Sequence, residues 1–388
     1  MIAPSVLFVD HTGALGGAEL YLLDVVRHYP GSAHVVLFED GPFADWLVES
    51  GVSVEVLEGR DSLLGVKRAG GLAGALRAIP NMLSLAKRVA QRARAHDVVF
   101  ANSQKALIVA SLASRLARRP LVWNLHDILT ADHFSAFNRK VAVAFANGFA
   151  QRVIVNSEAT LRAFHEAGGA VEKGTVVYNG VETAAFDEAR ADDVVSSRRE
   201  LGLVDVPVVG VFSRLSPWKG QHVLIEALPQ LPNVHALFVG SALFGEGGYE
   251  EKLYQLAERL GVSDRVHFLG FRSDIALLMK CCDVVAHTSV SPEPFGRVII
   301  EAMAAGRPVV ATKAGGALEI VTEETGLLIP PRDSAALAHA IRTVLNPDVG
   351  AWLATAARER VQTTFSQKET NAGIARVVDS VVNAEHLK

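Results

Sequence analysis

Cysteine is almost absent from this chain. Among 388 residues only Cys281 and Cys282 occur, and they are adjacent. Two neighbouring thiols cannot build a disulfide framework or a four-cysteine metal site. The chain is long enough for two domains with full hydrophobic cores, so it needs no covalent or metal cross-link. We therefore expect a protein of the reducing cytoplasm.

Long apolar runs are also lacking. No run approaches the ~18 residues that span a bilayer. The first residues, MIAPSVLFVDHTG, contain no basic region, and their apolar run stops at Asp10 and His11. We interpret this stretch as a first strand rather than a signal peptide. The expected protein is soluble, or peripheral at the inner face of a membrane.

The dinucleotide fingerprint G-x-G-x-x-G is missing. The loop after the first strand reads GALGGAE, with glycines at 13, 16 and 17. This spacing disfavours a dinucleotide-dependent dehydrogenase. Because the loop opens a helix, Gly16 and Gly17 would still allow close approach of a phosphate or an acceptor.

What the chain does contain is an alternation of short apolar runs with amphipathic stretches. Runs of this length, each followed by a helical pattern, predict parallel strands whose sheet is covered on both faces. The strands expected in the first half are 5–9, 34–38, 52–56, 97–101, 120–125 and 152–156. Those expected in the second half are 207–212, 234–240, 265–270, 283–288, 307–312 and 326–330.

The alternation breaks between residues 184 and 206, a polar, acid-rich stretch that we interpret as a linker. The sequence thus predicts an α/β protein of two doubly wound, Rossmann-like domains facing across a cleft. We expect residues 1–183 to form the first domain and 207–366 the second. The terminal helix, 367–388, should pack back on the first domain. Ligands of such sheets bind beyond the carboxyl ends of the strands.

Two basic residues follow the strand at 207–212, in SRLSPWKG. Arg214 comes directly after the strand, and Lys219 lies near a helix start suggested by Ser216 and Pro217. A guanidinium, an ammonium and a helix N-terminus form a site for an anion, and a diphosphate fits best. The alternative is a pair of solvated surface charges.

Two acids with seven residues between them stand in SPEPFGRVIIEAM. Prolines on both sides hold Glu293 on a rigid loop, and Gly296 allows a ligand to approach the backbone. Glu301 lies one turn into the next helix. Ionised carboxylates grip hydroxyl pairs well and phosphates poorly. The alternative makes Glu301 a helix-dipole residue and Glu293 a surface acid.

These motifs together resemble retaining glycosyltransferases with the GT-B fold, in particular glycosyltransferase family four. EPFGRVIIEAMAAGRPVVAT resembles the family's E-x7-E segment, and SRLSPWKG resembles its arginine–lysine pair. AGGALEIV, the NGV at 179–181 and GALGGAE are also similar. The resemblance covers essentially the whole chain and implies a hexosyltransferase. It also implies that 1–183 is the acceptor-side domain and 207–366 the nucleotide-sugar-binding domain.

The resemblance implies a role for each matching residue. Glu293 would bind hydroxyls of the transferred sugar and Glu301 the nucleotide ribose, while Arg214 and Lys219 would hold the diphosphate. The rest of the donor site would come from Gly16, Gly17, Gly270, Phe271, Arg272, Phe295, Gly296 and the backbone N–H groups of Val298 and Ile299.

His126 and Asp127 directly follow the strand 120–125. A histidine at this place in the family lies near the donor sugar, so the resemblance assigns His126 to catalysis together with Glu293, Arg214 and Lys219. The alternative is a structural histidine at a strand end. Asp127 would lie on the acceptor side, or would only orient the loop.

The resemblance also implies a mechanism. Transfer would retain the configuration of the sugar. Because no carboxylate nucleophile is identified in the sequence, our hypothesis is a front-face route in which the leaving diphosphate helps to deprotonate the acceptor. No metal or other cofactor is expected: the chain has no D-x-D pair, and cationic side chains would take the metal's place.

One block of the chain is basic. Eleven Lys and Arg residues but only one acid, Asp97, lie between Asp61 and Asp127. With its leucines, the region 62–126 suits an anionic membrane or a lipid-linked acceptor, and Arg88 and Arg92 are candidates for the acceptor side. The alternative is a solvated helix face. Nucleic acid is not expected as a partner.

Two other readings remain open. A sugar-nucleotide epimerase of the same fold should carry additional acid/base residues. A non-catalytic, glycosyltransferase-like subunit should lack Glu293, Arg214 or Lys219, and all three are present. The expected partners are a UDP- or GDP-sugar donor and a glycan, lipid-linked or small-molecule acceptor, as in polysaccharide biosynthesis. Motifs do not identify the sugar, because specificity lies in side chains outside them.

Overall fold

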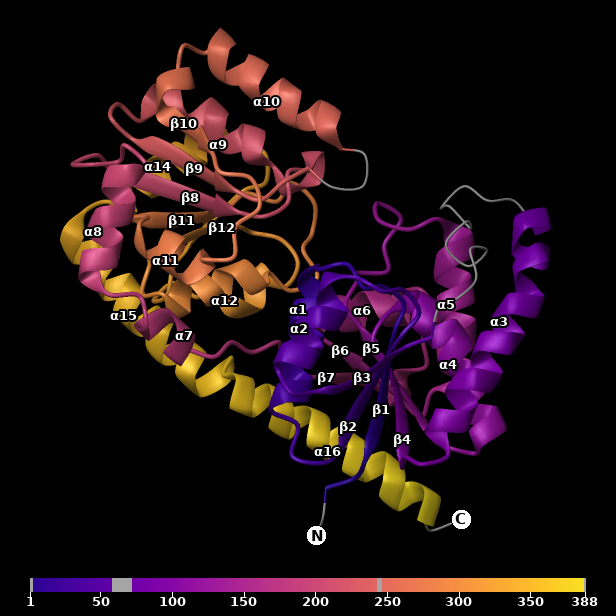
Figure 1. The fold of residues 1–388 in the computed structure, drawn as a ribbon. Coiled ribbons are helices and arrows are strands. Elements are labelled where there is room, and N and C mark those ends of the chain that lie inside the picture. Colours follow the sequence, from indigo (N-terminus) through magenta and orange to yellow (C-terminus); the bar gives the residue numbers. More distant parts are fainter. Residues whose placement is uncertain (1–2, 58–71, 243–245, 387–388) are drawn as a thin grey trace. The chain divides into compact units, whose positions relative to one another are not determined.

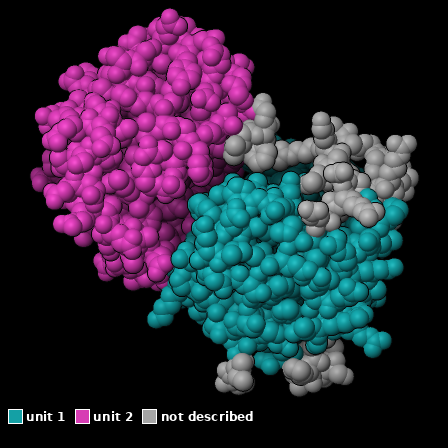
Figure 2. Space-filling view, in the orientation of Figure 1, with its two compact units in different colours: residues 1–179, 367–388 teal, residues 180–366 magenta. Residues whose placement is uncertain are grey.

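The computed structural model describes residues 3–57, 72–242 and 246–386. The chain divides into two compact units, which Figure 2 colours separately. Unit 1 comprises Met1–Asn179 and Gln367–Lys388, and unit 2 comprises Gly180–Ser366.

Unit 1 is built on a parallel sheet of seven strands within the described residues. In chain order they are β1 (Val6–Asp10), β2 (Ala33–Leu37), β3 (Ser53–Val56), β4 (Val98–Ala101), β5 (Leu121–Leu125), β6 (Arg152–Val155) and β7 (Gly174–Val176). Their order in the sheet is β3-β2-β1-β4-β5-β6-β7. The strand order therefore reverses between β1 and β4, and polar groups that follow these two strands are brought together there.

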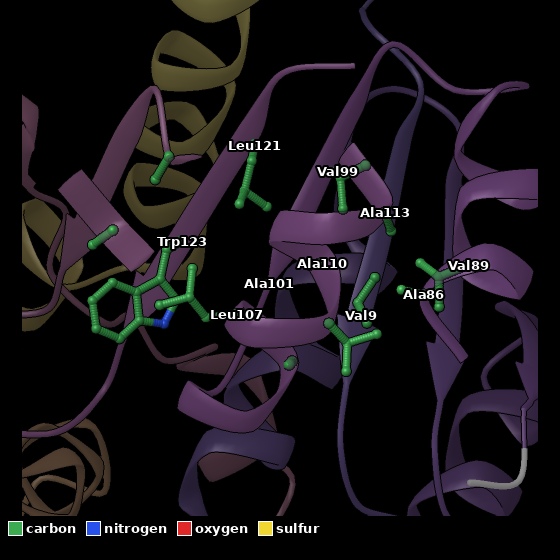
Figure 3. Packing of buried hydrophobic residues seen from close by; sticks show 14 of the residues in the cluster. Val9, Ala86, Val89, Val99, Ala101, Leu107, Ala110, Ala113, Leu121 and Trp123 are labelled. Atoms are coloured by element: carbon green, nitrogen blue, oxygen red, sulfur yellow. The ribbon is translucent and has the colours of Figure 1, made fainter. Parts of the chain in front are cut away.

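Helices cover both faces of this sheet (Figure 1). They are α1 (Gly17–Arg27), α2 (Pro42–Glu49), α3 (Leu72–Ala93), α4 (Gln104–Ala117), α5 (Ala136–Phe149), α6 (Glu158–Glu166), the 3-10 turn η1 (Val171–Lys173) and α16 (Gln367–His386). One core layer packs α3, α4 and α5 on the sheet around the buried Trp123 (Figure 3). The strands are apolar on both faces because both faces are buried.

The C-terminal helix α16 belongs to unit 1. Ile374 and Val378 are fully buried in the core layer that also contains Val6 and Phe8 of β1 and Tyr21 of α1. This apolar stripe explains why the last helix packs on the first sheet although the whole of unit 2 precedes it in the chain.

Unit 2 contains a second parallel sheet, with six strands among the described residues. They are β8 (Val208–Phe212), β9 (His235–Val239), β10 (Val266–Phe268), β11 (Val284–His287), β12 (Val309–Thr312) and β13 (Leu327–Ile329), in the order β10-β9-β8-β11-β12-β13. The reversal of strand order lies here between β8 and β11. These are the strands that precede the two motifs with the basic pair and the two acids.

The helices of unit 2 are longer toward its C-terminal end. They are α7 (Ala184–Asp187), α8 (Ala191–Glu200), η2 (Pro217–Lys219), α9 (Gln221–Ala227), η3 (Leu228–Gln230), α10 (Gly247–Arg259), η4 (Ser263–Arg265), α11 (Ile275–Lys280), α12 (Arg297–Ala304), α13 (Ala317–Ile320), α14 (Ser334–Val344) and α15 (Pro347–Thr364). A single core layer joins α9, α10, α14 and α15 to β8, β9, β11 and β12.

Two features differ from the sequence-based expectation. The segment 184–206, predicted as a linker, lies in unit 2 and contains α7 and α8. It is held there by Arg198, which donates hydrogen bonds to the Cys281 and Val206 carbonyls, and by the buried Phe186. α8 buries no residue of its own, so it has no apolar periodicity to detect. The short edge strand β7 was also not predicted.

Candidate functional site

The turn after β8 carries the two basic residues, but it is not the start of an α-helix. Pro217–Lys219 form a 3-10 turn, Gly220 takes the left-handed conformation with φ 70°, and α9 begins only at Gln221. The Ser216 hydroxyl does not cap a helix and instead donates to Glu246 Oε1 at 2.8 Å. A helical turn therefore starts at Pro217 as predicted, but it is a 3-10 turn, and the Ser216 side chain does not cap it.

This turn is tied to the loop that follows β11. The Val290 N–H donates to the Trp218 carbonyl, and the Thr288 hydroxyl donates to the Lys219 carbonyl, at 2.8 and 2.9 Å. A Cβ on Gly220 would collide with the Thr288 carbonyl oxygen. Only a glycine allows this close approach, which brings Lys219 beside the loop that carries Glu293.

The main chain of Glu293 is held from the other side by a glycine pair. Gly316 N–H donates to the Glu293 carbonyl at 2.9 Å. Gly315 has φ 60°, and a Cβ on it would collide with the Glu293 backbone. The AGGALEIV motif thus supports the Glu293 loop, which the sequence alone did not indicate.

The Glu293 carboxylate lies at the centre of a group of donors. Lys219 Nζ lies 2.7 Å from Oε1 and 2.8 Å from Oε2. The Ser289 hydroxyl donates to Oε2 at 2.8 Å, and His287 Nε2 lies 3.3 Å from the same oxygen. His287 and Ser289 were not predicted, although both stand at the end of β11 where polar side chains signal a site.

These donors keep Glu293 ionised. Burial by itself raises the pKa of Glu293, but the Lys219 charge and the His287 contact outweigh burial and hold the pKa well below its ordinary value. Lys219 also lies over the Trp218 ring, 4.1 Å from its centroid, and the Arg214 guanidinium lies 5.7 Å from it. Both predicted cations therefore converge on one indole ring.

The helix after this loop begins as predicted. Gly296 caps α12 with φ 103°, and Glu301 lies in its second turn. Arg297 Nε donates to Glu301 Oε1 at 2.7 Å, which orients the carboxylate. Ile299 N–H already donates to the Gly296 carbonyl, whereas Val298 N–H is a first-turn group for which a helix has no internal acceptor.

Of the other predicted donor-site residues, Phe295 is buried, whereas Phe271 and Arg272 are exposed. The Phe295 side chain is buried and packs edge-on against Phe365, so only its backbone can face a ligand. Phe271, in contrast, is 65% exposed, next to Gly270 with φ 65°. The Arg272 guanidinium makes two hydrogen bonds to Asp274, at 2.8 and 2.6 Å.

In unit 1, His126 lies at the carboxyl edge of the sheet, within a network of polar side chains. His126 Nε2 lies 2.8 Å from Asn102 Oδ1 and 3.0 Å from Asn124 Nδ2. Asn102 Nδ2 lies 2.6 Å from Asp10 Oδ2, and Asn156 Nδ2 donates to the His126 carbonyl.

Sequence reasoning missed the partners of His126. Asp10 ends β1, Asn102 follows β4, Asn124 lies within β5 and Asn156 follows β6. The signal was available, since VLFVD, VFAN and VIVN are apolar strands that each end in a polar side chain. Asp127, which was predicted, is exposed.

The glycine loop is shaped by Glu19. The carboxylate of Glu19 reaches back over Gly16, where a Cβ would lie 2.6 Å from Oε2, whereas a Cβ on Gly17 would meet open space. Burial, followed by the charge of Asp10 and that of Asp127, raises the pKa of Glu19 to about 8. A neutral acid therefore lies beside the ionised Asp10 at neutral pH.

The acceptor-side candidates on α3 face the edge strand β3. Arg92 Nε donates to Glu55 Oε2 at 2.9 Å, and the second nitrogen pairs with Oε1. This hydrogen bonding, together with nearby charges that include Arg88, lowers the pKa of Glu55. The structure thus uses Arg92 to hold α3 on the sheet. Of the basic region, residues 62–71 lie outside the described residues.

Features elsewhere are separate from these two clusters. A surface hollow of about 590 Å³ is lined by Thr322, Glu324, Arg360 and their neighbours, and a second of about 520 Å³ lies near Arg198 and Arg307. Across residues 3–57, 72–242 and 246–386, no cluster of three His, Cys, Asp or Glu side chains is arranged for a metal ion. In the same ranges, no helix combines the length and apolarity that a membrane crossing needs.

Two family models together match most of the chain. The family model described as Glycosyl transferases group 1 matches residues 196–360, and the model described as Glycosyltransferase Family 4 matches residues 15–185. The crystal structure of Anabaena HepE in complex with UDP and glucose is 45% identical. That comparison covers 97% of this chain and 100% of HepE, with a TM-score of 0.88.

More distant relatives cover less or show only the fold. A GDP-mannose-dependent phosphatidylinositol monomannoside mannosyltransferase of Corynebacterium glutamicum is 33% identical over 238 residues, which are 58% of this chain and 61% of the relative. The chain thus spans less than two thirds of that curated relative. A glycosyltransferase structure from Rickettsia africae is 22% identical with a TM-score of 0.81, covering 98% of this chain and 99% of the other.

Two parallel, Rossmann-like sheets with sites at their points of reversal define a protein of the GT-B fold class. The similarity to HepE over nearly the whole chain makes the family plain: the chain belongs to glycosyltransferase family 4. The predicted fold class and family are confirmed.

Proposed function

We propose that this protein transfers a hexose from a UDP-sugar to a hydroxyl group of a glycan, lipid-linked or small-molecule acceptor. The observation that carries the proposal is the Lys219–Glu293 pair at the point of strand reversal in unit 2, beside the start of α12. The HepE structures with UDP and with UDP-glucose support UDP-glucose as the first donor to test. The Corynebacterium relative makes GDP-mannose the second.

The pair can serve both ends of a nucleotide sugar. An ammonium has three donors, and Glu293 takes two of those of Lys219, so one remains for a diphosphate oxygen. Glu293 Oε2 accepts from Lys219 and Ser289 and also faces His287, whereas only Lys219 is found at Oε1 among the described residues. A sugar hydroxyl would therefore bind at Oε1.

The remaining roles follow from charge. Arg214 and Lys219 stabilise the negative charge that builds on the leaving diphosphate, with the Val298 N–H at the α12 N-terminus. Glu301, oriented by Arg297, accepts hydrogen bonds from the ribose hydroxyls. His126 serves the reaction from unit 1, and Asp127 from the acceptor side.

The transfer retains the configuration at the sugar carbon. The bond from that carbon to the diphosphate oxygen breaks, a bond to the acceptor oxygen forms on the same face, and the acceptor proton passes to the leaving diphosphate. No carboxylate is assigned as a nucleophile, because Glu293 is engaged by Lys219, Ser289 and His287. The anomeric configuration of the product, read by NMR, tests this route.

We extend the proposal to a peripheral contact with anionic membrane at the cytoplasmic face. The described part of the basic region ends in exposed Arg94, Arg115 and Arg118 beside the half-exposed Leu116, where α3 and α4 finish. Helices end at the edge opposite the strand carboxyl ends, so this surface lies away from His126. Co-sedimentation with vesicles containing phosphatidylserine, compared with phosphatidylcholine alone, tests the contact.

The donor proposal is tested by thermal unfolding with UDP, GDP, ADP and their sugars, without added metal. A nucleotide that binds only the folded protein raises the midpoint. We expect UDP and UDP-glucose to do so, and Glu301→Ala and Arg214→Ala to abolish the shift. Glu258→Ala and Arg259→Ala, at exposed positions of α10, are the matched controls.

The outcomes separate the competing functions. Release of UDP with a new glycosidic bond supports the transferase. Conversion of the UDP-sugar into its epimer would instead indicate an epimerase. The absence of any shift with any nucleotide would favour a non-catalytic subunit and overturn the proposal.

A further inference from the structure

We propose that Asp10 and Asn102 are positioning residues that hold the His126 imidazole in the tautomer with its proton on Nε2. The two residues stand at the ends of β1 and β4, the point of strand reversal in unit 1. The inference deepens the proposed function, since it rests on His126 serving the reaction. The protonation itself follows from contacts within unit 1 alone.

The protonation state of Asp10 determines which groups of this network donate hydrogen bonds and which accept them. This side chain is fully buried, which by itself raises its pKa, but hydrogen bonds and charge from His11, together with the Asn102 amide, outweigh burial and lower the pKa. The carboxylate is therefore ionised and can only accept hydrogen bonds. It accepts from the His11 N–H at 2.6 Å and from Asn102 at 2.6 Å.

Asp10 consequently sets the orientation of the Asn102 amide. The group that faces Asp10 Oδ2 must be a donor, so it is Nδ2, and the same nitrogen also lies 3.2 Å from the Ala18 carbonyl oxygen. Because both Asp10 Oδ2 and the Ala18 carbonyl oxygen are acceptors, the hydrogen-bond network fixes the orientation of the Asn102 amide. Asn102 Oδ1 then points away from Asp10, toward His126.

His126 must donate to this oxygen. Nε2 lies 2.8 Å from Asn102 Oδ1, a distance at which an unprotonated nitrogen and a carbonyl oxygen would repel each other. The proton therefore lies on Nε2, and in the neutral ring Nδ1 holds the lone pair.

One contact by itself would favour the tautomer with the proton on Nδ1. Asn124 Nδ2 lies 3.0 Å from His126 Nε2, and could donate to it if Nε2 were unprotonated. That arrangement would leave Asn102 Oδ1 facing the Nε2 lone pair at 2.8 Å. With the proton on Nε2, Asn124 donates instead to Asn102 Oδ1 at 3.3 Å, so Asn102 Oδ1 accepts from both side chains.

The ring is also held from other directions. The Tyr21 ring meets the imidazole edge-on with centroids 5.0 Å apart, and Asn156 donates to the His126 carbonyl at 3.2 Å. The titratable groups near the network are Asp10, His11, Glu19 and Asp127. Because Asn102 also binds Ala18 of the first turn of α1, the same residue aligns the glycine loop with His126.

The test is nitrogen NMR of the full chain labelled with [15N]histidine, with the His126 signals assigned by their loss in His126→Gln. We expect the wild type to show a protonated Nε2 and an unprotonated Nδ1. Asn102→Ala removes the acceptor and should give a mixture of tautomers. The isosteric Asp10→Asn replaces the carboxylate that orients Asn102 and should also give a mixture of His126 tautomers. This variant tests the proposal if Asn102→Ala does not fold.

A matched control is Asn147→Ala. Asn147 is a second amide of unit 1 that bonds backbone groups, Gly168 and Ala170, away from His126, and its loss should leave the His126 spectrum unchanged. In a UDP-glucose turnover assay, Asn102→Ala should lower kcat about 10- to 100-fold with little change in KM for the donor.

A wild-type spectrum with the proton on Nδ1 would overturn the proposal. So would a His126 spectrum that both Asp10→Asn and Asn102→Ala leave unchanged. Failure of the wild type to bind or turn over any nucleotide sugar would remove the proposed function, but the spectra would still decide the tautomer.

Discussion

The Nζ atom of Lys219 lies 2.7 and 2.8 Å from the two carboxylate oxygens of Glu293, although 74 positions separate the residues in the chain. Their side chains are only 15% and 12% exposed. A buried ion pair can contribute little net stability, whereas removal of one partner leaves the other charge buried and uncompensated. Substitution of either residue of the pair should therefore change the free energy of unfolding by a measurable amount.

We expect Lys219→Met and Glu293→Gln each to lower the free energy of unfolding by about 3 kcal/mol at pH 7. The double variant should lose much less than the sum of the two, because neither residue then leaves a partner behind. Urea unfolding of all four proteins measures the coupling. Strict additivity would show that the pair does not exist in solution.

Protonation of Glu293 should contribute to the loss of stability of the folded protein at acid pH. Its folded-state pKa lies below the ordinary 4.5. In the window below pH 4.5 the unfolded chain binds a proton that the folded protein does not, so the stabilisation present above 4.5 is lost as the pH falls. Glu293→Gln should therefore lose less stability than the wild type between pH 5 and 3 (about the range in which the unfolded carboxyl titrates). Equal acid slopes for the two proteins would contradict the burial and pairing of Glu293.

Glu19 should act in the opposite direction. Its pKa is raised from 4.5 to about 8, so between these values the folded protein holds a proton that the unfolded chain has lost. Stability contributed by this group therefore falls as pH rises, with a slope of up to about 1.4 kcal/mol per pH unit. We expect Glu19→Gln to gain stability relative to the wild type from pH 5 to 8 (roughly the window between the two pKa values). Thermal melts across this range measure it, and Glu49→Gln, at an exposed position of α2, is the control.

Two glycines with nearly the same backbone conformation should respond differently to alanine. Gly306 and Gly315 have φ 67° and 60°, but a Cβ meets nothing at Gly306 and collides with the Glu293 backbone at Gly315. Gly306→Ala should cost about 1 kcal/mol for the left-handed conformation. Gly315→Ala should cost clearly more and should also weaken donor binding, as measured by urea unfolding and calorimetry with UDP. Equal costs would show that Gly315 does not support the Glu293 loop.

Turnover of UDP-glucose should be insensitive to chelators. We propose that Arg214, Lys219 and the α12 N-terminus neutralise the leaving diphosphate, so treatment with EDTA should leave kcat unchanged. The matched measurement is the Arg214→Ala variant with and without added Mg²⁺. Loss of wild-type activity in EDTA, restored by Mg²⁺, would contradict the assignment.

Much of the fold could be read from the sequence. All twelve strands expected from apolar runs are present within a few residues of their predicted positions, because strands buried on both faces need continuous apolar side chains. β7 was not predicted, because Gly174–Val176 is a half-buried edge strand of only three residues. α8 was not predicted because none of its residues is buried, and Arg198 rather than an apolar stripe holds it in place.

The amino-acid sequence by itself determined which residue types stand at the strand ends: the basic pair after β8, the two acids around α12, and His126 after β5. Local rules suffice for these, because prolines, glycines and apolar runs act on their neighbours in the chain.

Only the tertiary structure decided which of these residues meet. The reversal of strand order brings Glu293 to Lys219 and Asp10 to Asn102. Burial raises the pKa of Glu19, whereas at Glu293 and Asp10 the neighbouring charges and hydrogen-bond donors outweigh burial and hold the pKa low. Contacts between residues far apart in the chain, and the removal of water around them, set these charges, and no local pattern records either.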